Sequence, residues 1–280
     1  MKPLEGNVAV VTGAGSGVGR SIAIALAQAG MNLALLSRTK TSLQEVAHHI
    51  QQIGCQAVCF PTDVCDPESV QSAVNQTLSH FTKIDILVNS AGIQGPIGPM
   101  AEIPVDEWVR TIQTNLMGTF LMCRAVLPGM ILRKKGTIIN LSGGGATRPR
   151  PFFSAYGASK AAVVRLTETL AHEVKPYNIR VNAVAPGAVY TRMTEEVLQA
   201  NDRAGSSAAE EAQQVKAQRN SPERAAALAV FLASPASNGL TGRLISAIHD
   251  DWEHLPSRME EVIRSDLFTL RRVDCLSKNT

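Results

Sequence analysis

Two side chains in the middle of the chain have the chemistry of an acid/base pair. The segment SGGGATRPRPFFSAYGASK at 142–160 ends in Tyr156 and Lys160, which are four residues apart and flanked by alanines. On a helix, positions i and i+4 project from one face and can act on one small target. A cation close to a phenol favours the phenolate, so the pair predicts proton transfer at an oxygen atom. Such a pair works with a polarising hydroxyl on the preceding loop, and here that loop holds Ser142 followed by three glycines.

A glycine-rich loop comes directly after the first apolar run. TGAGSGVG at 12–19 follows VAVVT at 8–12 and continues into a segment with helical apolar spacing. Glycines there allow a tight turn and a close approach of the backbone to a pyrophosphate, which then sits at the positive end of a helix. The spacing Gly13-x3-Gly17-x-Gly19 differs from the GxGxxG of common dinucleotide-binding folds. The loop predicts a dinucleotide site, and the alternative is a merely tight turn.

Seven short apolar runs alternate with helix-sized segments. Most of these runs lack polar alternation, as expected for parallel strands that are covered on both faces. The alternation predicts an α/β fold with a doubly wound parallel sheet of about seven strands and helices on both faces. The predicted strands are 8–12, 33–37, 57–60, 84–89, 137–142, 179–185 and 243–248.

We expect a single domain at 1–248, followed by a C-terminal extension at 249–280. Within the domain, residues 192–221 are rich in Ala, Gln, Glu, Ser and Asn and predict a helical lid over the substrate site. Low hydrophobicity also marks disorder, so a disordered surface insertion is the alternative. In the extension, the apolar spacing predicts a helix at 256–269, which would cover the substrate mouth or a subunit interface, or only decorate the surface.

Composition argues against several classes of protein. Of the 280 residues, 45% are hydrophobic and 18% are charged, which is typical of a globular protein. The net charge of +3 is spread along the chain, so nucleic acid is not expected as a partner. The longest apolar stretch, 22–36, is interrupted by polar residues and no signal peptide is recognisable, so we expect no membrane span and a cytoplasmic location. The five cysteines form no CxxC pair, which indicates reduced thiols, and no metal site is expected.

An ordered set of motifs carries a family resemblance. The motifs are TGAGSGVG (12–19), NSAG (89–92), Asn115, YGASK (156–160) and PGAVYT (186–191). Together they resemble the short-chain dehydrogenase/reductase family over about residues 6–245. The resemblance implies a Rossmann-type fold and hydride transfer between a nicotinamide cofactor and an alcohol or carbonyl carbon.

The resemblance also implies a cofactor site, residue by residue. The glycine loop would wrap the phosphates, the end of the third strand would meet the adenine, and Lys160 would hold the nicotinamide ribose. The implied cofactor-binding residues are Gly13, Ser16, Gly17, Val18, Gly19, Ser37, Arg38, Asp63, Val64, Asn89, Ala91, Gly92, Tyr156, Lys160, Pro186, Gly187, Val189 and Thr191. Taken singly, Asp63 and Asn89 are equally typical of turn caps.

The end of the second predicted strand bears on the choice of cofactor. A carboxylate there binds the adenosine ribose 2′-hydroxyl in NAD enzymes. This strand ends in Ser37-Arg38 with no acid, and a guanidinium can pair with a 2′-phosphate instead. We therefore favour NADP(H), while NAD(H) stays possible.

The implied catalytic residues are Tyr156, Lys160, Asn115 and Ser142. Tyr156 would give a proton to the developing alkoxide or take it in the oxidative direction, with its pKa lowered by Lys160 and the oxidised nicotinamide. Asn115 would hold a water molecule that links Lys160 to solvent.

The polarising hydroxyl departs from the family pattern. In the family, a serine precedes the tyrosine by thirteen residues, and here that position is Gly143. Ser142 is one residue early, and successive side chains on a strand point to opposite faces. The glycines could bend the chain and bring Ser142 round, Ser154 or Thr147 could replace it, or backbone N–H groups of the glycine run could bind the oxygen. Among these groups, Ser142 is the predicted polarising hydroxyl.

The leading hypothesis is a cytosolic NADP(H)-dependent oxidoreductase that acts on a small ketone or secondary alcohol. One alternative is an NAD-dependent sugar or polyol dehydrogenase. Another is a non-catalytic dinucleotide-binding sensor or partner protein, which Gly143 keeps open.

Substrate identity does not follow from the sequence. Arg148, Arg150, Phe152 and Phe153 could meet an anionic or apolar group, or lie on the surface. A homodimer or homotetramer is expected through the helices that include 106–132 and 154–176, as the resemblance implies.

Overall fold

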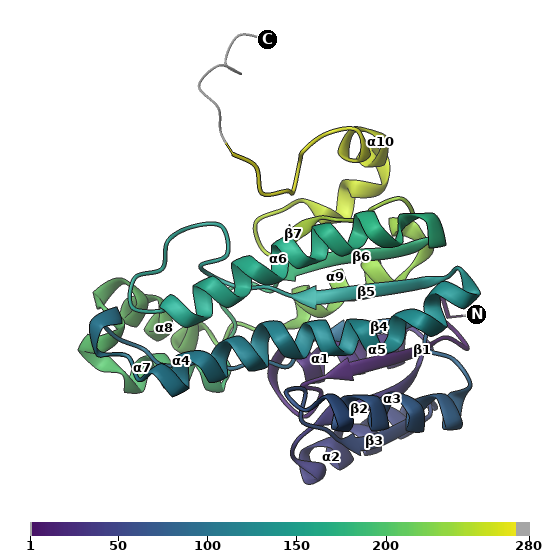
Figure 1. Ribbon diagram of the computed structural model, residues 1–280, viewed down its shortest axis with the longest axis horizontal. Coiled ribbons are helices and arrows are strands. Elements are labelled where there is room, and N and C mark those ends of the chain that lie inside the picture. The colour runs from purple at the N-terminus through teal and green to yellow at the C-terminus, as the bar shows by residue number, and fades with distance from the viewer. Residues whose placement is uncertain (1, 273–280) are drawn as a thin grey trace.

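The computed structural model describes residues 2–272, and within them seven strands form one parallel sheet in the order β3-β2-β1-β4-β5-β6-β7 (Figure 1). This confirms the predicted α/β fold with a doubly wound parallel sheet. The strands are β1 Val8–Thr12, β2 Asn32–Ser37, β3 Ala57–Pro61, β4 Ile86–Asn89, β5 Gly136–Leu141, β6 Ile179–Ala185 and β7 Leu244–Ser246. Each overlaps a predicted run, because uninterrupted apolar runs of this length are typical of strands buried on both faces.

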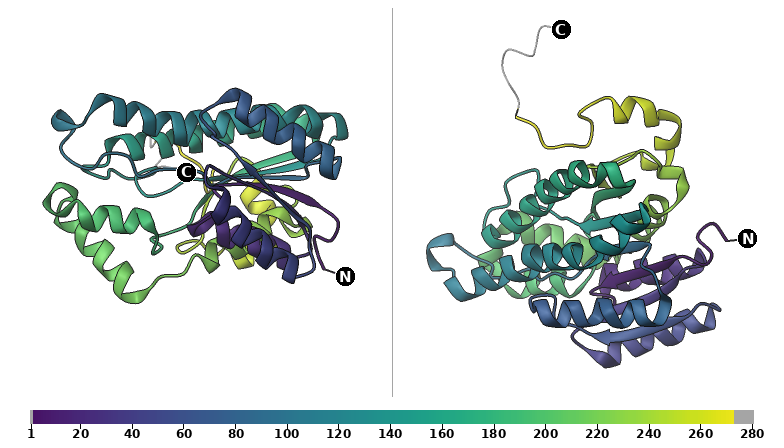
Figure 2. Two further views of the ribbon diagram at one scale, coloured as in Figure 1. Left: turned by 90° about the horizontal axis from the view of Figure 1, so that it is seen from below. Right: turned by 45° about the vertical axis from the view of Figure 1, so that its right-hand side comes forward.

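Helices cover both faces of the sheet (Figure 2). On one face lie α1 Gly17–Gln28, α2 Lys40–Gln52 and α9 Glu223–Ala233. On the other lie α3 Pro67–Phe81, α5 Gly118–Arg133 and α6 Ser154–Val174, with α4 Val105–Ile112 preceding α5. The short elements are η1 Met100–Glu102, the π-helical turn η2 Gln113–Met117, η3 Lys175–Tyr177 and η5 Pro235–Ser237.

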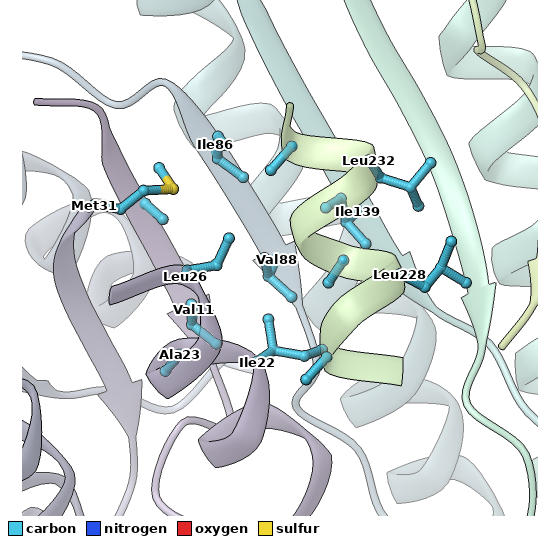
Figure 3. Packing of buried hydrophobic residues seen from close by; sticks show 14 of the residues in the cluster. Val11, Ile22, Ala23, Leu26, Met31, Ile86, Val88, Ile139, Leu228 and Leu232 are labelled. Carbon is cyan, nitrogen blue, oxygen red and sulfur yellow. The ribbon is translucent and has the colours of Figure 1, made fainter. Parts of the chain in front are cut away.

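Successive residues of each strand feed two separate cores. Val11 and Ile139 belong to the cluster that includes α1 and α9, whereas their neighbours Val10 and Ile138 belong to the cluster with α3, α5 and α6. The strand period of two produces this division. Figure 3 shows α1 and α9 close together on the first face, with the Ile22 side chain of α1 between the two helices. Burial of each such side chain contributes about 1.5–3 kcal/mol.

The predicted lid is helical. It consists of α7 Arg192–Gln199, η4 Asn201–Ala204 and α8 Ser206–Gln218, which lie beyond the carboxyl end of β5 (Figure 1). The break between the two helices falls at Gly205, whose φ of +76° is in the left-handed region that favours glycine. Val197, Ala204 and Ala212 of the lid pack in one apolar cluster with Phe153 and Tyr156.

The C-terminal extension returns to the sheet, but its helix is shorter than predicted. It contains η6 Trp252–Arg258 and α10 Met259–Ile263, in place of a helix over 256–269. The buried guanidinium of Arg243 explains the early end, because it donates to backbone carbonyls at and after the end of α10. The acceptors are the carbonyls of Val262 (2.8 Å), Ile263 (3.4 Å), Ser265 (2.9 Å) and Leu267 (2.8 Å). The chain then runs beside β7, where the Leu244 amide donates to the Phe268 carbonyl (2.8 Å).

One helical stretch, Val105–Arg133, is long and apolar enough by length and composition to cross a membrane. Its side chains Met122, Val126 and Met130 are buried in the core between helices and sheet. A core helix of a globular domain has these properties. The same stretch also carries exposed apolar residues, among them Val109 and Phe120.

Candidate active site

Helix α6 brings Tyr156 and Lys160 together beside the carboxyl end of β5. The Lys160 ammonium donates a hydrogen bond to the Leu141 carbonyl (2.9 Å) and lies 5.7 Å from the centroid of the Tyr156 ring. Both side chains are buried, with exposed fractions of 5% and 8% for Lys160 and Tyr156. The predicted pair therefore exists, and its lysine is anchored to the last residue of a central strand.

Burial dominates the protonation of both groups. It lowers the pKa of Lys160 to about 8 and raises the pKa of the Tyr156 phenol above its ordinary value. The charge that offsets part of the shift at Tyr156 is Arg150, which lowers the phenol pKa. The sequence predicts that Lys160 lowers the pKa of the phenol. In the structure its ammonium lies toward the face of the Tyr156 ring and is itself desolvated.

The phenol oxygen of Tyr156 lies against Gly143. A Cβ atom placed on Gly143 would lie 2.5 Å from the Tyr156 oxygen and 3.2 Å from the ring carbon that bears it. That distance is too short for any side chain at position 143 unless the tyrosine moves. A serine at position 143, as in the family pattern, would therefore require a different position of the tyrosine.

Of the hydroxyls proposed as replacements, two are engaged elsewhere. The Ser142 hydroxyl is buried and donates to the carbonyl of Lys160 (3.4 Å), so the glycines do not turn it toward the cleft. The Ser154 hydroxyl accepts a hydrogen bond from the Trp108 indole (3.3 Å). Thr147 and the glycine run line the cleft. This geometry favours the glycine run or Thr147 over Ser142 as the group that faces a substrate oxygen.

Asn115 lies in the π-helical turn η2, a kind of turn that is frequent at functional sites. Its side-chain amide accepts from the Ile93 N–H (2.9 Å) and donates to the Ile93 carbonyl (3.0 Å) and the Ser159 hydroxyl (3.0 Å). Asn115 therefore ties the loop after β4 to α6. A Cβ on Gly92 would lie 3.1 Å from its amide oxygen and 3.5 Å from the Lys160 nitrogen, so this loop passes between the two side chains.

The glycine loop has the shape of a dinucleotide cradle. Ser16 is the N-cap of α1, whose positive end therefore faces the loop. Gly13 has a φ of +64°, and a Cβ there would lie 2.9 Å from the Ala91 backbone. A Cβ on Gly19 would lie 2.4 Å from the Gly13 carbonyl. Side chains at Gly13 and Gly19 would clash with the backbone, so the glycines keep this turn tight. The residues Gly13, Ser16, Gly17, Val18 and Gly19 are thus candidates to hold a pyrophosphate.

Thr12 joins this loop to the next strand. Its hydroxyl accepts from the amides of Ser90 and Ala91 (3.0 Å each). The Asn89 amide donates to the Asn140 side chain (2.9 Å), whereas its buried oxygen has no partner within residues 2–272. The Asn89 side chain lies on the face of the sheet that α5 covers, because its amide also donates to the Cys123 thiol of that helix (3.3 Å).

The ends of β2 and β3 form the other side of the cradle. Ser37 ends β2, and the exposed Arg38 after it makes no hydrogen bond or ion pair with any described residue. Burial raises the pKa of the Cys65 thiol in the turn after β3, and the charge of Arg38 opposes this shift. In that turn Asp63 caps the Cys65 amide (2.9 Å) and Val64 is buried. The turn-cap role of Asp63 is thus present, and its side chain stays exposed.

The cleft beside Tyr156 has a volume of about 830 Å³. Its walls are the glycine run, the segment 186–191, the lid helices and Phe268–Leu270 of the extension. The cofactor candidates Pro186, Gly187, Val189 and Thr191 all line it. The C-terminal wall was not predicted at the residue level, because no local signal in the sequence shows where an irregular segment returns to the sheet. Among residues 2–272 no cluster of three or more metal-ligating side chains occurs.

Comparisons with known proteins agree with this architecture. The family model described as short chain dehydrogenase matches residues 7–202. A short chain dehydrogenase/reductase of Aspergillus oryzae, astE, is 38% identical over 245 residues, covering 87% of this chain and 94% of that protein. Two solved structures are also similar. NAD⁺-bound xylitol dehydrogenase has a TM-score of 0.81 at 32% identity, covering 88% of this chain and 98% of its own. A variant of actinorhodin polyketide ketoreductase with NADPH has a TM-score of 0.79 at 30% identity, covering 86% and 95%.

The buried Lys160 predicts a pH-dependent stability. Its pKa is about 8 in the folded protein, against about 10.4 for an exposed lysine. Between these values the unfolded state binds more protons, so the free energy of unfolding rises with pH in that window. Relative to Lys160→Met, the lysine protein should gain about 3 kcal/mol from pH 7 to pH 11. Urea unfolding of both proteins in a Tyr156→Phe background measures this difference without the tyrosine's own titration. A difference that stays constant with pH would mean that Lys160 is solvated.

Proposed function

The chain belongs to the short-chain dehydrogenase family, and on that premise we propose that it transfers a hydride between NADP(H) and a ketone or secondary alcohol, with Tyr156 as the proton donor and acceptor. It is an oxidoreductase that acts on CH–OH or C=O groups. This assignment favours an enzyme over the alternative of a non-catalytic dinucleotide-binding protein. The observation that supports Tyr156 as the proton donor and acceptor is its position in the cleft wall, with Lys160 buried behind it.

Bound nicotinamide would supply the hydride, or accept it in the oxidative direction. The glycine cradle and the start of α1 would hold the phosphates, and Lys160 would hold the nicotinamide ribose. The remaining implied contacts come from the ends of β2, β3 and β4 and from the segment 186–191.

Tyr156 would complete the reaction at the substrate oxygen. In reduction, the phenol proton passes to the oxygen as the carbonyl carbon gains the hydride; in oxidation, the phenolate takes the proton of the alcohol. Because burial raises the pKa of Tyr156, the protonated phenol is the resting form and reduction needs no prior proton uptake.

The carbonyl oxygen would be polarised by the glycine run rather than by a serine hydroxyl. Gly143 lies against the Tyr156 oxygen, and all three glycines line the cleft. Backbone N–H groups can stabilise a developing oxyanion as side-chain hydroxyls do. Ser142 donates to the Lys160 carbonyl and would support the lysine from behind.

Tyr156→Phe tests the proton donor. The substitution keeps the ring and its packing in the apolar cluster but removes the proton. We expect kcat to fall about 10²–10⁴-fold while NADPH affinity, measured by fluorescence titration, stays nearly unchanged. Turnover on a panel of ketones measures the effect.

Ser142→Ala is the matched comparison. If the glycine run polarises the carbonyl, this substitution should lower kcat far less than the roughly 10²–10³-fold loss expected from an oxyanion donor. A Tyr156→Phe protein with near-normal turnover would contradict the proposed proton donor. A roughly 10²–10³-fold loss of kcat in Ser142→Ala would show that Ser142 polarises the carbonyl.

NADP(H) is the proposed cofactor because the cation at the end of β2 is available. Arg38 is exposed and makes no hydrogen bond or ion pair with the described residues, as would suit a partner of the 2′-phosphate. The likeness to NAD⁺-bound xylitol dehydrogenase supports the alternative of an NAD-dependent sugar or polyol dehydrogenase. The two proposals differ in what Arg38 binds.

Arg38→Asp separates these cofactors. It turns a partner of the phosphate into a like charge, so NADPH should bind about 10–100-fold more weakly while NADH binding changes much less. Lys135→Asp, with the same charge change before β5, controls for net charge. Equal changes in both affinities would show that Arg38 does not discriminate.

The exposed apolar side chains of the α4–α5 stretch support association between copies of this chain. Val105 (77% exposed), Val109 (42%), Met117 (43%) and Phe120 (40%) are costly to leave in water. We expect a homodimer or homotetramer in sedimentation at micromolar concentration, shifted toward monomer by Phe120→Glu. A wild-type monomer would contradict this interface.

We also propose a cytoplasmic location, supported by the free thiols of Cys55, Cys59, Cys65 and Cys123. Cys275 lies outside the described residues. Recovery of the protein in a membrane fraction would contradict this location.

A further inference from the structure

Arg150 is a half-buried cation at the cleft for which the protein supplies no counter-charge. It lines the cleft, and it forms no hydrogen bond or ion pair with any side chain or carbonyl in residues 2–272. A partly buried guanidinium normally has a carboxylate or phosphate partner, because its desolvation is otherwise uncompensated. Arg150 therefore has unused donors that face the cleft.

The position of Arg150 is defined by its surroundings. Its guanidinium carbon lies 4.0 Å from the centroid of the buried Phe153 ring, a cation–π contact. The turn that carries both residues is fastened by the Gly98 amide, which donates to the Phe152 carbonyl (2.9 Å). A stacked and anchored guanidinium is preorganised for binding, since little side-chain freedom remains to be lost.

Arg150 also lies next to the reacting group. A Cβ on Gly144 would lie 3.6 Å from a terminal nitrogen of Arg150, and a Cβ on the preceding Gly143 would meet the Tyr156 oxygen. The guanidinium of Arg150 and the phenol of Tyr156 thus lie near two consecutive glycines, Gly144 and Gly143. A molecule with its carbonyl oxygen at Tyr156 would have an adjacent substituent within reach of Arg150.

The other charged groups of the cleft do not neutralise Arg150. Arg148 and His249 are exposed, and Glu211 on α8 is exposed without a contact to Arg150. The Asp250 carboxylate accepts from the Ser246 amide (2.7 Å). The cofactor phosphates belong to the cradle at the start of α1, so a substrate group remains as the partner.

We propose that Arg150 binds a carboxylate next to the reacting carbonyl, so that the substrates are oxo acids and the corresponding hydroxy acids. This inference rests on the proposed function. The guanidinium fork pairs with the two carboxylate oxygens, and Tyr156 serves the neighbouring carbonyl oxygen. The apolar lining from Val197, Met193 and Leu270 receives the rest of the molecule.

Matched acid and ester substrates test the assignment. The pairs are 2-oxo-4-phenylbutanoate with its ethyl ester, and pyruvate with methyl pyruvate. The wild-type enzyme should prefer the acid in at least one pair. Arg150→Met should lower kcat/KM for that acid about 10–100-fold, mainly through KM, and leave the ester within about threefold. For the acid, the kcat/KM of Arg150→Lys should fall between those of the wild-type enzyme and Arg150→Met. The control Lys135→Met, which removes an exposed positive charge before β5, should change neither substrate by more than about threefold.

A binding measurement separates this inference from the proposed function. Calorimetric titration of 2-oxo-4-phenylbutanoate into the protein saturated with NADP⁺, a combination that cannot react, should show binding that Arg150→Met weakens and Lys135→Met does not. Equal use of acid and ester by the wild-type enzyme, or an equal loss of both in Arg150→Met, would overturn the carboxylate role. Failure to reduce any ketone would overturn the proposed function, while the titration would still decide whether Arg150 binds the carboxylate.

Discussion

Parallel strand pairing is the constraint on which the candidate site depends. β1, β4, β5 and β6 run in the same direction, so their carboxyl ends meet at one edge of the sheet. At that edge Thr12 accepts the amides of the loop after β4, and the Leu141 carbonyl accepts the Lys160 ammonium. The cofactor cradle and the tyrosine–lysine pair are therefore attached to β1 and β5, the two strands that flank β4 in the sheet.

The glycine run controls the space around the tyrosine. Gly143 has no side chain, so the Tyr156 oxygen can approach the end of β5, and Arg150 lies over the next two glycines. The phenol is otherwise surrounded by the apolar cluster of Phe153 and the lid, which raises its pKa. Arg150 thus takes up space that side chains at Gly144 and Gly145 would fill.

Two segments distant in sequence close the cleft, and each is held by different forces. The lid contributes Val197 and Ala212 through apolar packing, and its Arg203 donates to the Ile97 carbonyl (3.2 Å) and the Glu102 carboxylate (3.0 Å). The C-terminal wall is held by Arg243, whose hydrogen bonds to four carbonyls are directional.

The sequence by itself determined the strands, the cofactor cradle and the spacing of Tyr156 and Lys160. These features are local, since they follow from apolar runs, from glycines required by backbone geometry and from the period of one helix. Tertiary structure decided the direction of the Ser142 hydroxyl, which bonds a carbonyl 18 residues away, and the early end of α10, which depends on Arg243. It also added a second cation to the surroundings of Tyr156, since the charge of Arg150 opposes the rise that burial causes in the pKa of the phenol. Each of these outcomes depends on contacts between segments that only packing brings together, so no local pattern in the sequence could specify them.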